Sequence, residues 1–267
     1  MKNPFKNKTV WIVGASSGIG QALAENLSEQ GARLILSSRN EEKLNEIKNS
    51  SSKSENIKIF PLDILKFNEL EEKTAQAFAF FGKIDCVFLN SGTSSRGTVL
   101  ETQIDVHQKI MNLDYFSYVI LTQKILPFFI KQKSGHFVVT SSIMGKIGTP
   151  LRSAYAAAKH ALHGFYDCLR AETAKDGIRV TLLTPGHIST EISFHTLTAD
   201  GSPKGMNDET HQNGLPADKA AQQILRALAR NKNEVYIGKK LTQEHLSLFL
   251  FRLCPDLLHK IVRKKIP

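Results

Sequence analysis

Short apolar runs alternate along this chain with longer amphipathic stretches. The spacing predicts strands over 9–13, 33–37, 57–60, 84–89, 136–140 and 178–184. It predicts helices over 18–30, 41–48, 67–80, 102–133 and 153–175. Alternation of this length indicates βαβ units, in which parallel strands are joined by helices on both faces of a sheet. Because such crossovers are right-handed, we expect a single Rossmann-type, doubly wound α/β domain spanning residues 1–267.

This rhythm breaks after residue 184. Residues 187–215 are rich in Gly, Ser, Thr, Asn and His, and a loop of this length in a compact domain usually has a function. We interpret the segment 187–215 as a lid over a substrate. A helix over 217–230 and a short strand, Val235-Tyr236-Ile237, then resume the pattern.

The C-terminal tail, 241–267, combines an apolar cluster with a basic end. One interpretation is a helix lying in a membrane interface, which would give a peripheral membrane contact. The other is a helix docked on a neighbouring subunit or on the sheet, and the interruption at Pro255 favours this second interpretation. The apolar cluster consists of Leu246, Leu248, Phe249, Leu250, Phe251, Leu253, Leu257, Leu258, Ile261 and Val262, followed by Arg263-Lys264-Lys265.

The net charge of +10 sits mainly at the two ends of the chain. Residues 1–8 contain three lysines, and residues 230–267 contain nine Lys or Arg against three Asp or Glu. A nucleic-acid-binding protein usually carries its basic face on the folded body, so we expect no nucleic-acid partner. The ends are more typical of solvated tails or of a weak contact with an anionic membrane surface.

The sequence shows no signal for a membrane span, a cleaved leader, a disulfide or a zinc site. No apolar run approaches the ~20 residues of a spanning helix, and the first predicted strand begins too early for a cleaved leader. Cys86, Cys168 and Cys254 lie far apart, which argues against disulfides and a zinc site. We expect a cytoplasmic protein without a metal, with Cys86 and Cys168 as buried thiols, and with membrane association, if any, at the inner surface.

A glycine-rich turn follows the first predicted strand and opens the first predicted helix. Its residues are Gly14-Ala15-Ser16-Ser17-Gly18-Ile19-Gly20. Glycines at this spacing let the backbone approach a pyrophosphate, and the helix N-terminus faces its negative charge. In the strand–turn–helix context this motif predicts a dinucleotide site.

The end of the second predicted strand bears on cofactor choice. Dinucleotide folds that select NAD carry a carboxylate there for the ribose 2′-hydroxyl. Here Ser38-Arg39-Asn40 occupies that place, and a guanidinium suits a 2′-phosphate through two parallel hydrogen bonds. The alternative is an exposed arginine that starts a polar turn. We favour NADP(H).

Tyr155 and Lys159 lie early in the predicted helix 153–175, four residues apart and therefore on one face. A phenol has a pKa near 10. An ammonium about 4 Å away stabilises the phenolate by roughly 4 kcal/mol at an effective dielectric of ~20. A neighbouring Tyr and Lys can therefore form an acid/base pair suited to neutral pH. A hydroxyl at Ser142, after the strand 136–140, can orient a carbonyl oxygen.

Taken together, these motifs resemble the short-chain dehydrogenase/reductase family along nearly the whole chain. The resemblance implies that Tyr155 exchanges a proton with the substrate oxygen, that Lys159 holds the nicotinamide ribose, and that Ser142 binds the carbonyl. It also implies a homodimer or homotetramer acting on a small carbonyl or alcohol substrate.

Segment 192–216 resembles the branch near the 11β-hydroxysteroid dehydrogenases and acyl-dihydroxyacetone-phosphate reductases, which implies an apolar or lipid-like substrate. The implied cofactor contacts are Gly14, Ser16, Ser17, Gly18, Ile19, Gly20, Ser38, Arg39, Asp63, Ile64, Asn90, Ser91, Gly92, Tyr155, Lys159, Pro185, Gly186, Ile188 and Thr190.

The chain departs from the family most clearly at Asp114. The family keeps an asparagine at this position of the fourth helix, where it helps a proton relay reach the lysine. Either Asp114 takes that place in the catalytic site, or the local register differs and Asn112 serves instead. This departure leaves a second class of function open, a catalytically quiet nucleotide-binding or regulatory protein with the same fold. The intact Ser142, Tyr155 and Lys159 favour an active enzyme.

Overall fold

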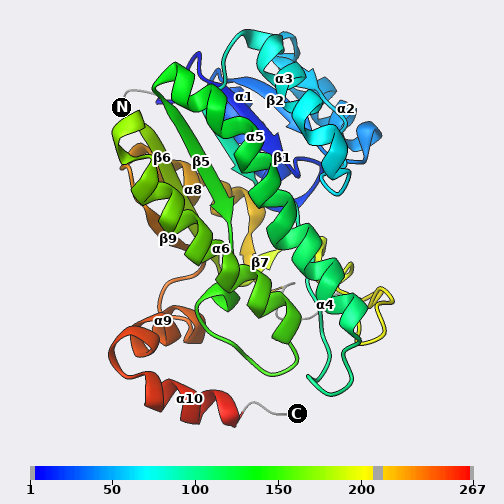
Figure 1. Ribbon diagram of the computed structural model, residues 1–267, viewed down its shortest axis with the longest axis vertical. Helices are drawn as coiled ribbons and strands as arrows, with labels where there is room; N and C mark the ends of the chain where they lie inside the picture. The colour runs from blue at the N-terminus through cyan, green and yellow to red at the C-terminus, as the bar shows by residue number, and fades with distance from the viewer. Residues whose placement is uncertain (1–3, 207–212, 265–267) are drawn as a thin grey trace.

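The computed structural model describes residues 4–206 and 213–264. At its centre lies a seven-stranded parallel sheet, in the order β3-β2-β1-β4-β5-β6-β9 (Figure 1). The predicted strands are present with small shifts at their ends. Their bounds are β1 Thr9–Val13, β2 Arg33–Ser37, β3 Ile57–Ile59, β4 Cys86–Leu89, β5 Gly135–Thr140, β6 Ile178–Pro185 and β9 Glu234–Ile237.

Helices cover both faces of this sheet, as the alternation of patterns predicts. One face is covered by α1 (Gly18–Glu29) and α8 (Ala217–Ala229), with α2 (Glu41–Ser50) near the sheet edge. The other face is covered by α3 (Leu70–Phe81), α5 (Ser117–Gln132) and α6 (Ser153–Glu172). The single domain therefore has three layers, with an apolar core on each side of the sheet.

Strand β1 shows why both cores form. Successive side chains of a strand point to opposite faces, so Val10 and Ile12 pack with α1 while Trp11 and Val13 pack on the other side. All four are at most 1% exposed. Burying one such side chain contributes roughly 1.5–3 kcal/mol. A strand that is apolar at every position is thus typical of the middle of a parallel sheet.

The order of the strands reverses at β1, because the chain adds strands first on one side of β1 and then on the other. This reversal in strand order determines where the site lies. Strand β1 pairs with β2 on one side and with β4 on the other. The connections that follow β1 and β4 therefore lead to helices on opposite faces of the sheet. In open α/β sheets, ligands bind in the crevice that this separation creates.

The predicted helix 102–133 is present as three consecutive segments. It begins as α4 (Ile104–Met111), widens into one π-helical turn (Asn112–Phe116), and continues as α5. A π turn adds a residue to the helix and re-aims the side chains around it, and such turns are frequent at functional sites. The hydroxyl of Ser117 donates to the Leu113 carbonyl at 2.6 Å inside this widened stretch.

The segment predicted as a lid has some short structure of its own. Ile188–Ser189 (β7) pairs in parallel with Leu215–Pro216 (β8). Residues 194–203 fold back onto the loop after β4, where Leu197 bridges to Ser95. Residues 207–212 of the predicted lid lie outside the described part of the structure.

The C-terminal tail forms two helices that extend from one end of the molecule (Figure 1). Helix α9 spans Gln243–Leu253, and α10 begins at Pro255 and ends at Arg263, so Pro255 interrupts the tail as the sequence predicts. Among the residues that the structure describes, no helix combines the length and the apolarity needed to cross a bilayer. The prediction of two buried thiols is half wrong. Cys86 is buried in β4, but Cys168 is exposed because it lies on the outer side of α6.

Candidate active site

In the glycine turn after β1, the backbone comes very close to neighbouring segments. Gly14 has a φ of +87°, and a Cβ there would lie 2.6 Å from the backbone nitrogen of Ser91. Gly18 has a φ of +54°, and a Cβ there would lie 2.9 Å from the Thr190 side chain. Only glycine adopts such conformations without strain, and only glycine leaves room for the neighbouring atoms at these two positions.

The N-terminus of α1 opens into a hollow of about 370 Å³. Ser17 precedes the helix in an extended conformation, and within the described residues its side chain caps no backbone N–H of α1. A helix end of this kind presents backbone N–H groups to an anion. The hollow also includes Gly18, Lys43 and Thr190, so it joins the glycine turn to the segment after β6.

The ends of β2 and β3 lie side by side at one end of the crevice. Ser38 and the exposed Arg39 precede Asn40, whose side chain caps α2 by accepting from the Lys43 backbone N–H at 3.0 Å. The Ser38 carbonyl accepts from the Leu62 N–H at 3.0 Å. This hydrogen bond holds the segment after β3 next to the end of β2. Asp63 is half-buried and accepts from the Leu65 N–H, and Ile64 is buried.

Asn90 connects three strands at the centre of the crevice. Its amide donates to the Gly14 carbonyl at 3.2 Å, and its oxygen accepts from the Thr140 hydroxyl at 2.9 Å. The next carbonyl, that of Ser91, accepts from the Tyr118 hydroxyl at 2.5 Å. The loop after β4 is therefore fixed to the turn after β1 and to the end of β5.

Tyr155 and Lys159 lie one turn apart on α6, as their spacing predicts. Lys159 Nζ lies 5.6 Å from the centre of the Tyr155 ring and donates to the Thr140 carbonyl at 3.2 Å. Both side chains are buried, with 9% of Tyr155 and 3% of Lys159 exposed. The ammonium is thus held beneath the tyrosine by the end of β5.

Asp114 faces Lys159 from the π turn. Its Oδ2 lies 3.1 Å from Lys159 Nζ, and its Oδ1 accepts from the Thr93 N–H at 3.0 Å. The side chain of Asp114 is completely buried, whereas Asn112 is exposed. Of the two positions that the sequence left open, the structure brings Asp114 to the lysine and leaves Asn112 facing solvent.

The pair is strongly coupled. Burial raises the pKa of Asp114, against the opposing effect of the Lys159 ammonium. Burial also disfavours the lysine cation, but the charge and hydrogen bond of Asp114 together with the nearby Tyr155 outweigh this effect and raise the pKa of Lys159. The distance of 3.1 Å makes the two groups a buried salt bridge, in which the negative charge of Asp114 reduces the field of the Lys159 ammonium.

Ser142 and the segment after β6 line the same edge of the sheet. Ser142 follows β5, and its Oγ accepts from the Met144 N–H at 3.1 Å, which caps the short helical turn Ile143–Gly145. After β6, which ends at Pro185, the Gly186 N–H donates to the Ile237 carbonyl at 2.9 Å. Ile188 beyond it is buried, and Thr190 is half-buried beside Gly18.

Sequence reasoning missed three residues that position these groups. Thr140 binds both Asn90 and Lys159, Tyr118 fixes the Ser91 carbonyl, and the Thr93 N–H holds Asp114. A weak signal existed for Thr140, because a polar residue at the carboxyl end of a central strand lies beside the site. Tyr118 and Thr93 gave no signal, since their contacts come from residues distant in the sequence.

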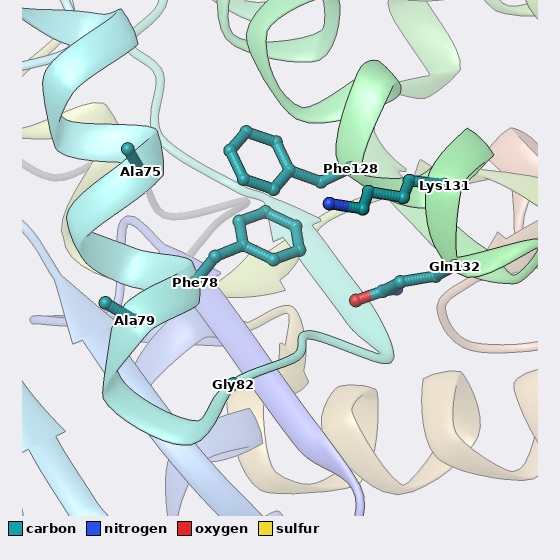
Figure 2. A pocket seen from close by; sticks show the side chains of 7 residues that line it. All are labelled: Ala75, Phe78, Ala79, Gly82, Phe128, Lys131 and Gln132. Atoms are coloured by element: carbon teal, nitrogen blue, oxygen red, sulfur yellow. The ribbon is translucent and has the colours of Figure 1, made fainter.

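A second hollow, of about 550 Å³, lies away from this site between α3 and α5 (Figure 2). The rings of Phe78 and Phe128 stack there with their centres 4.2 Å apart. Because α3 ends at Phe81, shortly before β4 begins, this hollow lies toward the amino ends of the strands. It includes none of the predicted site residues, which gather at the opposite edge.

This combination of fold and site matches a known family of oxidoreductases. The family model described as short chain dehydrogenase matches residues 8–199. A Drosophila melanogaster protein named dehydrogenase/reductase SDR family protein 7-like is 36% identical over 99% of this chain and 82% of its own length. Dehydrogenase/reductase SDR family member 7B of Bos taurus is 36% identical over 99% of this chain and 83% of its own length. The chain belongs to the short-chain dehydrogenase/reductase family.

Solved structures agree with this fold. A short-chain dehydrogenase from Streptomyces avermitilis superposes with a TM-score of 0.81 at 25% identity, covering 98% of this chain and 100% of the other. A short-chain dehydrogenase from Burkholderia cenocepacia in complex with NADP gives a TM-score of 0.80 at 22% identity, covering 98% and 99%. One from Burkholderia phymatum in complex with NAD gives 0.82 at 20% identity, covering 98% of each chain. Relatives of this fold thus bind either nicotinamide cofactor.

Proposed function

We propose that this oxidoreductase is an active NADP(H)-dependent enzyme that interconverts a carbonyl compound and a secondary alcohol. The observation that carries the proposal is the buried cluster of Tyr155, Lys159 and Asp114, which Thr140 and Asn90 link to the glycine turn. A protein that only bound a nucleotide would have no need to bury an ammonium beneath a tyrosine, because burying a charge costs free energy.

The nucleotide end of the crevice fits a dinucleotide. Side chains at Gly14 and Gly18 would collide with Ser91 and Thr190, and the α1 N-terminus is open to an anion. The proposal that the cofactor is NADP(H) rests on Arg39, which is exposed at the end of β2 where NAD-selecting folds carry an acid. When bound, the cofactor supplies or accepts the hydride.

The chain's own residues manage the proton. In the reductive direction, the Tyr155 hydroxyl donates a proton to the developing alkoxide oxygen of the substrate. The Ser142 hydroxyl donates a hydrogen bond to the same oxygen, where negative charge grows. Lys159 favours the phenolate left on Tyr155, while the Thr140 carbonyl and Asp114 hold its ammonium in place.

The loop that faces the lid supports an apolar substrate. Val99 and Leu100 are 76% and 95% exposed, in a loop fixed on one side by the Gly97–Leu151 backbone contact. On the other side, the Gln103 N–H binds the Ala199 carbonyl of the lid. Two apolar side chains held at this position can bind the hydrocarbon part of a lipid-like substrate.

Assembly and compartment complete the proposal. Phe116 and Ile130 are 45% and 43% exposed on the helix that runs from the π turn through α5. We expect them to be covered by a second subunit in a homodimer or homotetramer. The Cys86, Cys168 and Cys254 thiols are all free, which suits a reducing compartment such as the cytoplasm.

A spectrophotometric screen tests this function. Purified protein with NADPH is offered steroid, dicarbonyl and long-chain ketone substrates, and loss of NADPH absorbance is followed beside a Tyr155→Phe control. We expect turnover of at least one apolar carbonyl by the native chain and none by the variant. NADPH binding without turnover of any substrate would instead favour the quiet regulatory protein.

A further inference from the structure

The two C-terminal helices have an inner side and an outer side. On the inner side, Leu248 and Leu250 of α9 and Val262 of α10 pack around the buried Leu258. This cluster rests on Ile143 and Ile147, in the loop that begins directly after Ser142. The hairpin of α9 and α10 is therefore attached to the loop that leaves the active site.

The outer side carries a row of apolar side chains that this chain leaves exposed. Leu246, Phe249 and Leu253 lie on one face of α9, at i, i+3 and i+7, and are 47%, 55% and 74% exposed. Leu257 and Ile261 lie four residues apart on α10 and are 49% and 41% exposed. We call these five residues the outer apolar face. Exposed apolar side chains gathered in this way mark a surface that binds something.

Basic residues accompany this face. Between 243 and 264, Arg252, Lys260, Arg263 and Lys264 stand against Glu244 and Asp256. Glu244 is turned toward the body of the protein, where its carboxylate pairs with His187 and accepts from the Tyr236 hydroxyl at 3.2 Å. The hairpin therefore presents apolar side chains with a surplus of positive charge.

We infer that the outer apolar face docks on the surface of an anionic lipid bilayer. Apolar side chains flanked by lysine and arginine are suited to the boundary between acyl chains and negatively charged headgroups. A second copy of the chain would bring the same cations against each other, which disfavours self-association through this face. The hairpin lies on the bilayer and does not cross it, since neither helix of the described chain is long enough.

Docking would bring the active site close to the lipid. The inner side of the hairpin packs on Ile143 and Ile147, in the loop that begins directly after Ser142. Its first turn reaches the segment after β6 through the pair of Glu244 and His187. A lipid-like substrate could then enter from the membrane; this consequence rests on the proposed function, whereas docking itself does not.

Vesicle sedimentation tests the inference with the full chain. Protein is mixed with vesicles of phosphatidylcholine alone, or of phosphatidylcholine with phosphatidylglycerol, and the bound fraction is measured at low and high salt. We expect binding to the anionic vesicles that weakens with salt. Two variants of the face, Phe249→Ser and Leu253→Ser, should each lower it several-fold. Charge removal by Lys260→Gln together with Arg263→Gln should lower the affinity roughly thirtyfold, and only for anionic vesicles.

Matched controls keep the test decisive. Phe80→Ser removes a similarly exposed ring, 38% exposed, from α3 at the far end of the molecule, and should leave vesicle binding unchanged. Circular dichroism and NADPH titration of each variant separate loss of docking from loss of folding or of cofactor binding. Absence of native-chain binding to anionic vesicles would overturn the inference. So would conversion of an oligomer to a monomer by Phe249→Ser with vesicle binding intact, which would make this face a subunit contact.

Discussion

The Asp114 carboxylate lies 3.1 Å from the Lys159 ammonium, and both side chains are shielded from solvent. The resemblance to the short-chain dehydrogenase/reductase family implies an asparagine at this position, which would be neutral and could both donate and accept. An ionised aspartate only accepts, and it brings a negative charge to the lysine that lies one helical turn from Tyr155. An ion pair therefore stands where the resemblance implies a neutral contact.

This ion pair leads to a prediction about pH. Alcohol oxidation needs the phenolate form of Tyr155, which the positive charge of Lys159 favours and the negative charge of Asp114 opposes. Asp114→Asn removes the opposing charge, so oxidation should depend less on high pH. We expect the pH optimum for oxidation to move down and the rate near neutral pH to rise. Measurement of kcat against pH checks this.

Asn112 provides the matched control for that experiment. It lies two residues from Asp114 in the same π turn, but its side chain is exposed. Asn112→Ala should leave both the rate and the pH profile unchanged. An unmoved profile in Asp114→Asn, together with a slower Asn112→Ala enzyme, would contradict the role assigned to the ion pair.

The acid/base pair makes a second prediction. Tyr155→Phe keeps the ring but removes the proton donor, so turnover should fall by at least about 10²-fold with NADPH affinity nearly unchanged. Lys159→Ala should damage both, because the lysine is expected to contact the cofactor as well as to favour the phenolate. Initial rates and a fluorescence titration of NADPH separate the two effects. Normal turnover by Tyr155→Phe would refute the mechanism.

Much of the fold could be predicted because its signals are local. The apolar run 9–13 and the glycines at 14, 18 and 20 predict a strand, a tight turn and a helix, and the structure has all three. Tyr155 and Lys159 also share a helix, so their spacing alone places them on one face. The proximity of Tyr155 and Lys159 could therefore be predicted from one short segment.

What could not be predicted depends on contacts between distant segments. The π turn at Asn112–Phe116 has the same apolar pattern as an ordinary helix, yet it decides that Asp114 faces the lysine. The position of Cys168 on the outer side of α6 likewise depends on how that helix is rotated against the sheet. Periodicity predicts that a helix has an apolar side, but not which residues at its margin are covered.

Cofactor preference can be tested at Arg39. We expect Arg39→Ala to weaken NADPH binding at least about tenfold, equal to ~1.4 kcal/mol, because a guanidinium would be lost from the 2′-phosphate. The affinity for NADH, which has no such phosphate, should stay the same and is the internal control. Isothermal titration of both cofactors measures the effect. Equal affinity of the native chain for NADPH and NADH would remove the basis for this preference.

Assembly can be tested on α5. If Phe116 and Ile130 lie in a subunit contact, Phe116→Arg together with Ile130→Arg should shift the native oligomer to a monomer, because a buried unpaired charge is costly. Light scattering at micromolar concentration reports the mass. Leu65→Arg, at a residue that is 40% exposed elsewhere on the surface, should keep the native mass. A native chain that is itself monomeric would contradict the proposed dimer or tetramer.

The start of the central sheet provides a last prediction, about stability. Asp85 accepts from the Thr9 N–H at 2.9 Å and lies 3.0 Å from Lys8 Nζ, so it joins the beginnings of β1 and β4. Burial alone would raise the pKa of Asp85, but the Thr9 hydrogen bond and the Lys8 ammonium together lower it.

Since the folded-state pKa of Asp85 lies below that of the unfolded chain, the carboxylate stabilises the fold above the unfolded value of about 3.9. That stabilisation is lost as the pH falls through the folded value. Asp85→Asn should therefore lower the free energy of unfolding by about 1 kcal/mol at neutral pH. The difference from the native chain should shrink below about pH 4. Urea unfolding at several pH values measures this difference in the free energy of unfolding.

Glu69→Gln, which breaks the exposed pair with Lys66, should change stability far less, because exposed ion pairs contribute little. An Asp85→Asn deficit that stays constant from neutral to acid pH would show that the charge of Asp85 is not what stabilises the sheet.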